Sequence, residues 1–105
     1  MDLTQSFGLV FKRLRLARGL SQEFFSPVVT DRYLRKLEKG GASPTLDTLA
    51  RLAELLEIHP STLIALCEAD RISDTDLESL LASINEEIRI ARGLNAPHKT
   101  RLKPQ

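Results

Sequence analysis

Four basic side chains fall within eight consecutive positions of the stretch TDRYLRKLEKG, residues 30–40. They are Arg32, Arg35, Lys36 and Lys39. On an α-helix, where successive residues are about 100° apart, the four share one stripe about 100° wide. Tyr33, Leu34 and Leu37 fall on the opposite side of the same helix. One face of this helix would therefore pack on a protein core, and the other would offer cations to a polyanion.

A basic helix face can also be an ordinary solvated surface, so the polyanion hypothesis needs further support. The stripe contains no acid, and the helix is short and follows another short segment after a tight turn. Residues 1–45 carry eight Lys and Arg against four Asp and Glu, residues 46–90 three against ten, and residues 91–105 four against none. This distribution would attract a polyanion to one end of the molecule and repel it from the middle.

The remaining residues do not form a pattern typical of catalysis. His59 precedes a proline, His98 lies near the C-terminus, and Cys67 is the one cysteine, which we expect to be half-buried packing. A single cysteine excludes an internal disulfide and gives no paired metal-ligand spacing. We find no glycine-rich phosphate loop either. The sequence therefore predicts no enzyme, no metal site and no cofactor.

Length and composition predict one small domain with an appended element. The chain has 105 residues, of which 42% are hydrophobic, enough for a core. The N-terminal stretch MDLTQSF has no long apolar run and is not expected to be a signal peptide. The longest apolar run, LIALC at residues 63–67, is far shorter than a membrane span. We expect a cytoplasmic protein that makes no membrane contact.

The apolar periodicity predicts an all-α fold of six helices. Phe7, Val10, Phe11 and Leu14 mark the first helix, at about residues 4–18, and Gly19 ends it. Ser21 is expected to cap a second helix that Pro27 keeps short, and Thr30 to cap a third over residues 31–39. A fourth helix is expected after a Ser43 cap, with Pro44 just inside and with Leu46, Leu49, Ala50, Ala53 and Leu56 on one face.

Two more helices are expected towards the C-terminus. The fifth covers about residues 59–69, and the sixth covers residues 73–93, with Ser73 as its cap and Asp76 completing a capping box. Residues 94–105 include two prolines and show no periodicity, so we expect a flexible basic tail. The tail is either an unstructured solubilising end or an electrostatic arm that lies along the polyanion. The expected units are residues 1–70, 71–93 and 94–105.

The segments LRLARGLSQEFF (14–25), YLRKLEKG (33–40) and SPTLDTLARLAELLEIHPSTLI (43–64) resemble one known family in their order and spacing. They look like the helix-turn-helix domain of Cro and lambda-repressor type regulators, the xenobiotic-response-element (XRE) family. The resemblance implies a five-helix domain whose third helix, residues 31–39 here, lies in the DNA major groove. It covers about 60% of the chain.

The resemblance also implies roles for individual residues. Base readout falls on the N-terminal and central part of the third helix, at Asp31, Arg32, Arg35 and Lys36. Phosphate contacts fall on its flanks, at Gln22, Tyr33, Lys39 and Thr45. Arg15 and Glu38 match positions that form a partly buried ion pair between the first and third helices. The stretch from Gln22 to Glu38 is about two residues shorter than usual, with Val28 where glycine is common, so the second helix or its turn must be reduced.

The sixth helix carries a second apolar pattern. Leu77, Leu81, Ile84, Ile88 and Ala91 follow one another in steps of four, three, four and three. This spacing is typical of a coiled-coil seam across two heptads. The helix could fold back over the preceding helix of its own chain, or it could pair with a second copy. A homodimer would set two reading helices on successive turns of the major groove, ~34 Å apart.

These patterns together predict a sequence-specific, double-stranded-DNA-binding transcriptional regulator that acts as a homodimer on a palindromic operator at the nucleoid. The alternative is a protein-partner module that also binds DNA. It could be the antitoxin of a toxin–antitoxin pair, a restriction–modification controller, or an adaptor whose sixth helix or tail binds another protein.

Overall fold

The computed structural model describes residues 1–71 and 76–93. Within them all regular structure is helical, as predicted. The chain divides into two units, Met1–Ser73 and Asp74–Gln105. The first holds α1 (Leu3–Ala17), the 3-10 helix η1 (Gln22–Phe25), α2 (Asp31–Glu38), α3 (Leu46–Leu55) and α4 (Pro60–Arg71), and the second holds α5 (Leu77–Ala91). The basic tail predicted for residues 94–105 lies outside the described residues.

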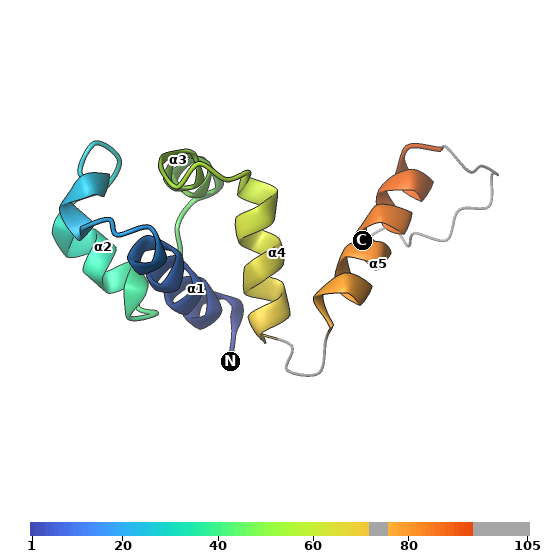
Figure 1. The fold of residues 1–105 in the computed structure, drawn as a ribbon, viewed down its shortest axis with the longest axis horizontal. Coiled ribbons are helices and arrows are strands. Elements are labelled where there is room, and N and C mark those ends of the chain that lie inside the picture. Colours follow the sequence, from blue (N-terminus) through green and yellow to red (C-terminus); the bar gives the residue numbers. More distant parts are fainter. Residues whose placement is uncertain (72–75, 94–105) are drawn as a thin grey trace. The chain divides into compact units, whose positions relative to one another are not determined.

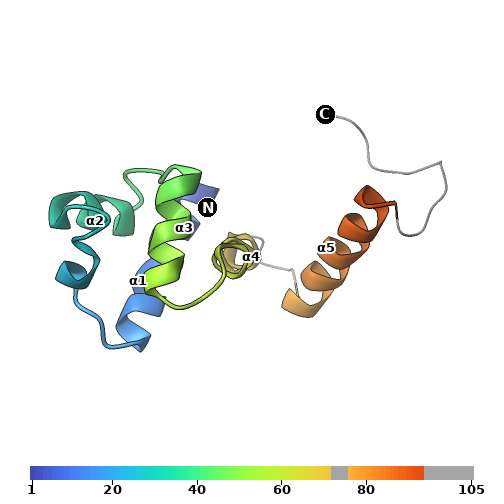
Figure 2. The ribbon, with the colours of Figure 1, turned by 90° about the horizontal axis from the view of Figure 1, so that it is seen from above.

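Helix α1 is fixed at its N-terminus by a reciprocal cap. The Asp2 carboxylate accepts a hydrogen bond from the Gln5 backbone N–H at 2.9 Å, and the Gln5 side chain accepts one from the Asp2 N–H at 3.1 Å. The helix ends at Ala17, and Gly19 follows with φ +70°, a left-handed conformation that glycine adopts without strain. Figures 1 and 2 show α1 lying between α2 and α4, and it packs against both.

The second helix of the predicted fold is reduced to four residues of 3-10 helix. Ser21 caps η1 as expected, since its hydroxyl oxygen accepts from the Phe24 N–H at 3.2 Å. Pro27 cannot continue a helix, and the chain instead turns through residues 26–29. The stretch from Gln22 to Glu38 can therefore be shorter than usual, because η1 and this turn use few residues. Phe25 stays fully buried, with its ring edge on Phe11 at a centroid distance of 5.1 Å.

Helix α3 starts two residues later than predicted. Its N-cap is Thr45, whose hydroxyl oxygen accepts from the Thr48 N–H at 3.1 Å, so the expected Ser43 cap was wrong. Leu46 is consequently the first helical residue. It points away from the core with 78% of its surface exposed, and its assignment to the core face was also wrong. Leu49, Ala53 and Leu56 are buried as predicted, and Ala50 is half-buried. Leu52, which the predicted face did not include, is also buried.

The core of the first unit is built from all five of its helical segments. Its buried apolar side chains are Phe7, Val10, Phe11, Phe25, Leu34, Leu37, Leu49, Leu52, Ala53, Leu56, Leu63 and Cys67. Ser6 and Arg15 are the buried polar residues of α1, and the Ser6 hydroxyl donates to the Cys67 carbonyl oxygen at 2.6 Å. This hydrogen bond links α1 to α4. It also satisfies the buried hydroxyl, which would destabilise the fold if it had no partner.

Helix α5 starts later than its sequence suggests. The expected Ser73 cap lies outside the described residues, and the helix begins at Leu77 with Asp76 in the N-cap position. The Asp76 carboxylate makes no capping hydrogen bond to the backbone and instead accepts from the Ser79 hydroxyl at 3.3 Å. No side chain of α5 is buried within the described residues.

Gly8 allows α1 to approach the end of α2 closely. A Cβ atom at this position would overlap the Leu37 carbonyl oxygen and lie 3.0 Å from the Glu38 carbonyl oxygen. Both are backbone atoms at the end of α2. The contact is therefore possible only for a residue without a side chain.

We expect Gly8→Ala to destabilise the protein by about 1–3 kcal/mol through this overlap, although alanine favours a helix by about 1 kcal/mol. Thermal or urea unfolding followed by circular dichroism would measure the change. Leu16→Ala, at an exposed position of the same helix, is the control and should shift the free energy of unfolding by less than about 0.5 kcal/mol. A stabilised Gly8→Ala variant would show that α1 and α2 are not in this contact.

Candidate nucleic-acid interface

Helix α2 is short, and local signals in the sequence set both of its ends. The Thr30 hydroxyl oxygen accepts from the Tyr33 N–H at 3.1 Å, which caps the N-terminus. Asp31 follows in the first turn, where the partial positive charge of the helix end favours an acid. Gly40, with φ +78°, turns the chain away after Lys39. These features leave eight residues in which all the predicted base-reading side chains lie.

The two faces of α2 differ as their spacing predicts. Leu34 and Leu37 are fully buried, and Tyr33 is half-buried against the same core. Arg32, Arg35, Lys36 and Lys39 are exposed, and so is Asp31. Within residues 1–71 and 76–93 no carboxylate pairs with any of the four cations. Their charges therefore remain available for an external anion.

A buried ion pair joins the end of α1 to the end of α2. Arg15 Nε donates to Glu38 Oε2 at 2.6 Å, and Nη2 donates to Glu38 Oε1 at 2.9 Å. Only 9% of the Arg15 side chain and 4% of the Glu38 side chain are exposed. The hydrogen bond to Glu38 raises the pKa of the Arg15 guanidinium further, against the opposing effect of burial. Both groups are thus held charged in a two-point contact that fixes the relative orientation of α1 and α2.

Two further hydrogen bonds attach the turn and η1 to this pair. Arg15 Nη1 donates to the Leu20 carbonyl oxygen at 3.0 Å, and Gln22 Nε2 donates to Glu38 Oε1 at 3.1 Å. Gln22, predicted as a phosphate contact, is therefore half-buried and bound to the carboxylate of the pair. An amide nitrogen carries two hydrogens, so the second remains for another acceptor.

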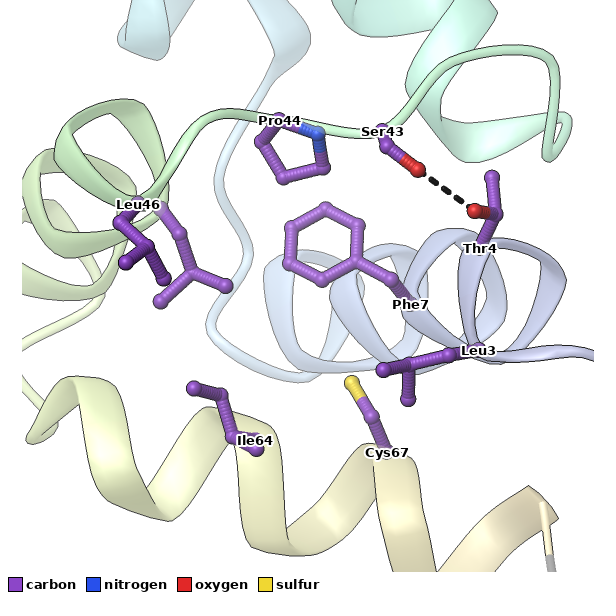
Figure 3. Close-up of a pocket in the computed structure, with 9 residues that line it drawn as sticks. Leu3, Thr4, Phe7, Ser43, Pro44, Leu46, Ile64 and Cys67 are labelled. Atoms are coloured by element: carbon purple, nitrogen blue, oxygen red, sulfur yellow. Dashed lines mark hydrogen bonds between the residues drawn. The ribbon is translucent and has the colours of Figure 1, made fainter. Parts of the chain in front are cut away.

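The loop between α2 and α3 is anchored from two sides at Ser43. The hydroxyls of Thr4 and Ser43 are hydrogen-bonded across the start of α1, as Figure 3 shows. The Tyr33 hydroxyl donates to the Ser43 carbonyl oxygen at 3.4 Å. Ser43 was expected only as a helix cap, and the sequence carried no signal for these long-range partners. Thr45, predicted to bind phosphate, is exposed, and its hydroxyl donates to the Thr48 hydroxyl oxygen at 3.0 Å.

An open apolar groove lies beside this loop. Its lining comes from the starts of α1 and α3, the loop and α4, and its volume is about 210 Å³. Figure 3 shows Phe7, Leu46 and Ile64 around it, with Pro44 above. Cys67 also lines the groove, and burial together with Asp70 and Glu68 raises the pKa of its thiol to about 12. The thiol is therefore protonated near neutral pH and a poor nucleophile.

The described residues contain no group of three or more His, Cys, Asp and Glu side chains that could hold a metal ion. No helix among them combines the length and the hydropathy needed to cross a membrane. The features that stand out in this unit are thus the cationic face of α2, the buried pair beneath it and the apolar groove.

Comparison with known proteins agrees with this geometry. A family model described as helix-turn-helix matches residues 11–63. An uncharacterized HTH-type transcriptional regulator, y4dJ, of Sinorhizobium fredii is 36% identical over 66 residues, which are 61% of this chain and 86% of that protein. No solved structure matches significantly.

Loss of one partner of the buried pair should be costly, because the other charge would stay poorly solvated. We expect Glu38→Ala to lower the free energy of unfolding by about 3 kcal/mol or more. Arg15→Met combined with Glu38→Leu should recover over half of that loss, since no buried charge remains. Arg13→Ala breaks an exposed pair with Asp70, whose atoms are 3.0 Å apart, and should cost less than about 1 kcal/mol. Urea unfolding would compare them, and equal costs for Glu38→Ala and Arg13→Ala would contradict the prediction.

Proposed function

Because the chain belongs to the XRE-type helix-turn-helix family of DNA-binding transcriptional regulators, we propose that it recognises a specific double-stranded operator through α2. One observation carries the proposal. Helix α2 and its C-cap present four exposed cations that have no acidic partner among the described residues, while the other face of α2 is packed into the core. An α-helix fits the major groove, and cationic side chains on its outer face can reach both phosphates and base edges.

Base readout is assigned to the exposed residues of the first two turns of α2. Arg32, Arg35 and Lys36 can donate to the O6 and N7 atoms of guanine, and Asp31 can accept from the N4 amino group of cytosine. All four side chains are exposed on the helix that the buried ion pair holds in place. A fixed backbone matters because a bidentate contact requires both hydrogen bonds to form at once.

Phosphate contacts are assigned to residues around the two ends of α2. Lys39 is an exposed cation at its C-cap. Gln22 keeps one amide hydrogen beyond its bond to Glu38, and the Tyr33 hydroxyl lies at the loop beside Ser43. Thr45 caps α3, whose first backbone N–H groups point out of the helix N-terminus and can bind an anion. These contacts would position the protein on DNA without selecting bases.

The proposed assembly is a homodimer on a palindromic operator, at the nucleoid. Its support is the apolar face of α5, where Leu77, Leu81 and Ile88 are exposed by 40%, 47% and 49% and Ile84 lies between them. A 15-residue helix with no buried side chain is marginally stable by itself in water. Pairing with a second copy covers this face and makes two α2 helices available to two half-sites.

A second proposal is that the regulator also binds a protein, as an antitoxin or a restriction–modification controller would. The observation in its favour is the apolar groove, where Leu46 and Ile64 are 78% and 41% exposed. Both proposals use α2 in the same way. Only the second proposal predicts that a protein encoded beside this one co-purifies with it. It also predicts that Leu46→Glu abolishes that association while operator binding persists.

Arg32→Ala and Arg35→Ala should each weaken binding to the selected operator by about 1–3 kcal/mol and relax the base choice, because a base contact is lost. Lys39→Ala should weaken binding to all duplexes equally. Selection from random duplex DNA, followed by titration at fixed salt, would measure both effects. Arg71→Ala, an exposed cation at the end of α4, is the control and should change neither. An unchanged selected motif in the Arg32→Ala, Arg35→Ala double variant would exclude α2 as the reading helix.

Leu81→Glu and Ile88→Glu each place a charge in the apolar face of α5 and should shift the chain to a monomer. Sedimentation at micromolar concentration would show this as a halved mass. Binding to a full palindrome should fall to the level of a half-site. Ser83→Glu adds the same charge on another side of the helix and should leave the dimer intact. A dimer that survives Leu81→Glu would place the interface away from α5.

A further inference from the structure

We propose that the two α5 helices of the dimer pair in antiparallel orientation, with Glu78 of each helix beside Arg92 of the other. This inference rests on the proposed homodimer and adds the direction of pairing and the charged contacts that select it. Three properties of α5 favour it, namely its charge distribution, the volumes along its apolar face and its length.

The charges of α5 are distributed unevenly along the helix. Asp76 and Glu78 make its N-terminal end acidic, whereas Glu86 and Glu87 balance Arg89 and Arg92 towards its C-terminal end. Parallel pairing would gather four carboxylates at the N-terminal end of the dimer, with no cation of α5 beside them. Antiparallel pairing sets each acidic end against an end that carries cations and also opposes the two helix dipoles. The electrostatic free energy therefore favours the antiparallel pair.

The apolar face is also better matched when the second helix is reversed. Leu77 then lies opposite Ala91, Leu81 opposite Ile88, and Ile84 opposite Ile84 of the second helix. Large residues at one end face small ones, so the helices can keep one spacing along the interface. In a parallel pair, two alanines would meet at residue 91 and two leucines at residue 77, which leaves the C-terminal end underfilled.

The residues beside this face specify the contacts of each orientation. Glu78 and Arg92 lie on the same flank of the apolar face, and both are exposed. Reversal of one helix brings Glu78 next to Arg92 twice, once at each end. Glu87 lies on the other flank, where it would face Leu80 in an antiparallel pair. In a parallel pair Glu87 would instead meet Arg92, so the two orientations use different acids.

The length of α5 gives the antiparallel pair a wider separation between its two entry points. Fifteen residues span about 22 Å, so the chains would enter the paired helices about 22 Å apart. In a parallel pair the entry points would be separated only by the helix spacing of about 10 Å. The wider value is closer to the ~34 Å that separates two half-sites.

Charge reversal in the full chain tests the orientation. Glu78→Arg and Arg92→Glu should each weaken dimerisation about tenfold, because two attractive pairs become repulsive. The double variant Glu78→Arg, Arg92→Glu should return dimerisation to within about threefold of the unmodified chain. Both reversals oppose the helix dipole, so recovery in the double variant can come only from the restored pairs. Sedimentation equilibrium gives the dissociation constants, and circular dichroism checks that α5 remains helical.

Glu87→Arg is the matched control, because it reverses an acid in the same helix that has no cation opposite it in the antiparallel pair. It should change the dissociation constant by less than about threefold. Rescue of Arg92→Glu by Glu87→Arg, rather than by Glu78→Arg, would overturn the proposal in favour of parallel helices. Single reversals without effect would overturn it in favour of an interface outside α5. An unmodified chain that stays monomeric would overturn the dimer itself, while operator binding by α2 is measured separately.

Discussion

The buried pair of Arg15 and Glu38 is the contact on which the arrangement of the first unit depends. One carboxylate receives two hydrogen bonds from α1 and one from η1, and the same guanidinium holds the carbonyl oxygen of Leu20 in the turn between them. Burial of two charges offsets much of their attraction, so the pair adds little net stability. Its contribution is geometric, because four segments meet at one point and α2 cannot rotate without breaking it.

Close packing around α1 complements this electrostatic anchor. Gly8 brings the α1 backbone against the end of α2, and the rings of Phe11 and Phe25 meet edge to face beneath η1. The second helix of the motif can therefore shrink to four residues, because its place is secured by one aromatic side chain and one amide. Helix α2 is held by its neighbours on both sides, and its exposed face needs no structural role.

Local signals account for the parts of the fold that the sequence predicted well. The cationic stripe of α2 and the caps at Ser21 and Thr30 follow from spacing and from side chains that bond within three residues. Where two neighbouring residues can both cap a helix, the local sequence predicted the wrong cap. Ser43 and Thr45 can both cap a helix, and Ser43 is instead engaged by Thr4, 39 positions earlier in the chain. The wrong assignment of Leu46 to the core face followed from the wrong choice of cap.

Other features depend on contacts that no local pattern encodes. Gly8 could have been noticed as a glycine within an apolar helical stripe, but the backbone that it approaches belongs to another helix. The bond from Gln22 to Glu38 likewise joins residues 16 positions apart. The resemblance to a known family implied a role for each of these two residues. The hydrogen bond between them becomes evident only in the three-dimensional structure.

The absence of buried side chains in α5, within the described residues, has a consequence for how such a regulator would respond to its own abundance. In the proposed dimer the order of this helix comes from association, so folding of α5 and occupancy of the dimer rise together by mass action. At low copy number the chain would pay the cost of ordering α5 before it could bind two half-sites. Operator occupancy would then rise more steeply than in proportion to the number of molecules. The regulator would thus respond to its own concentration in the cell.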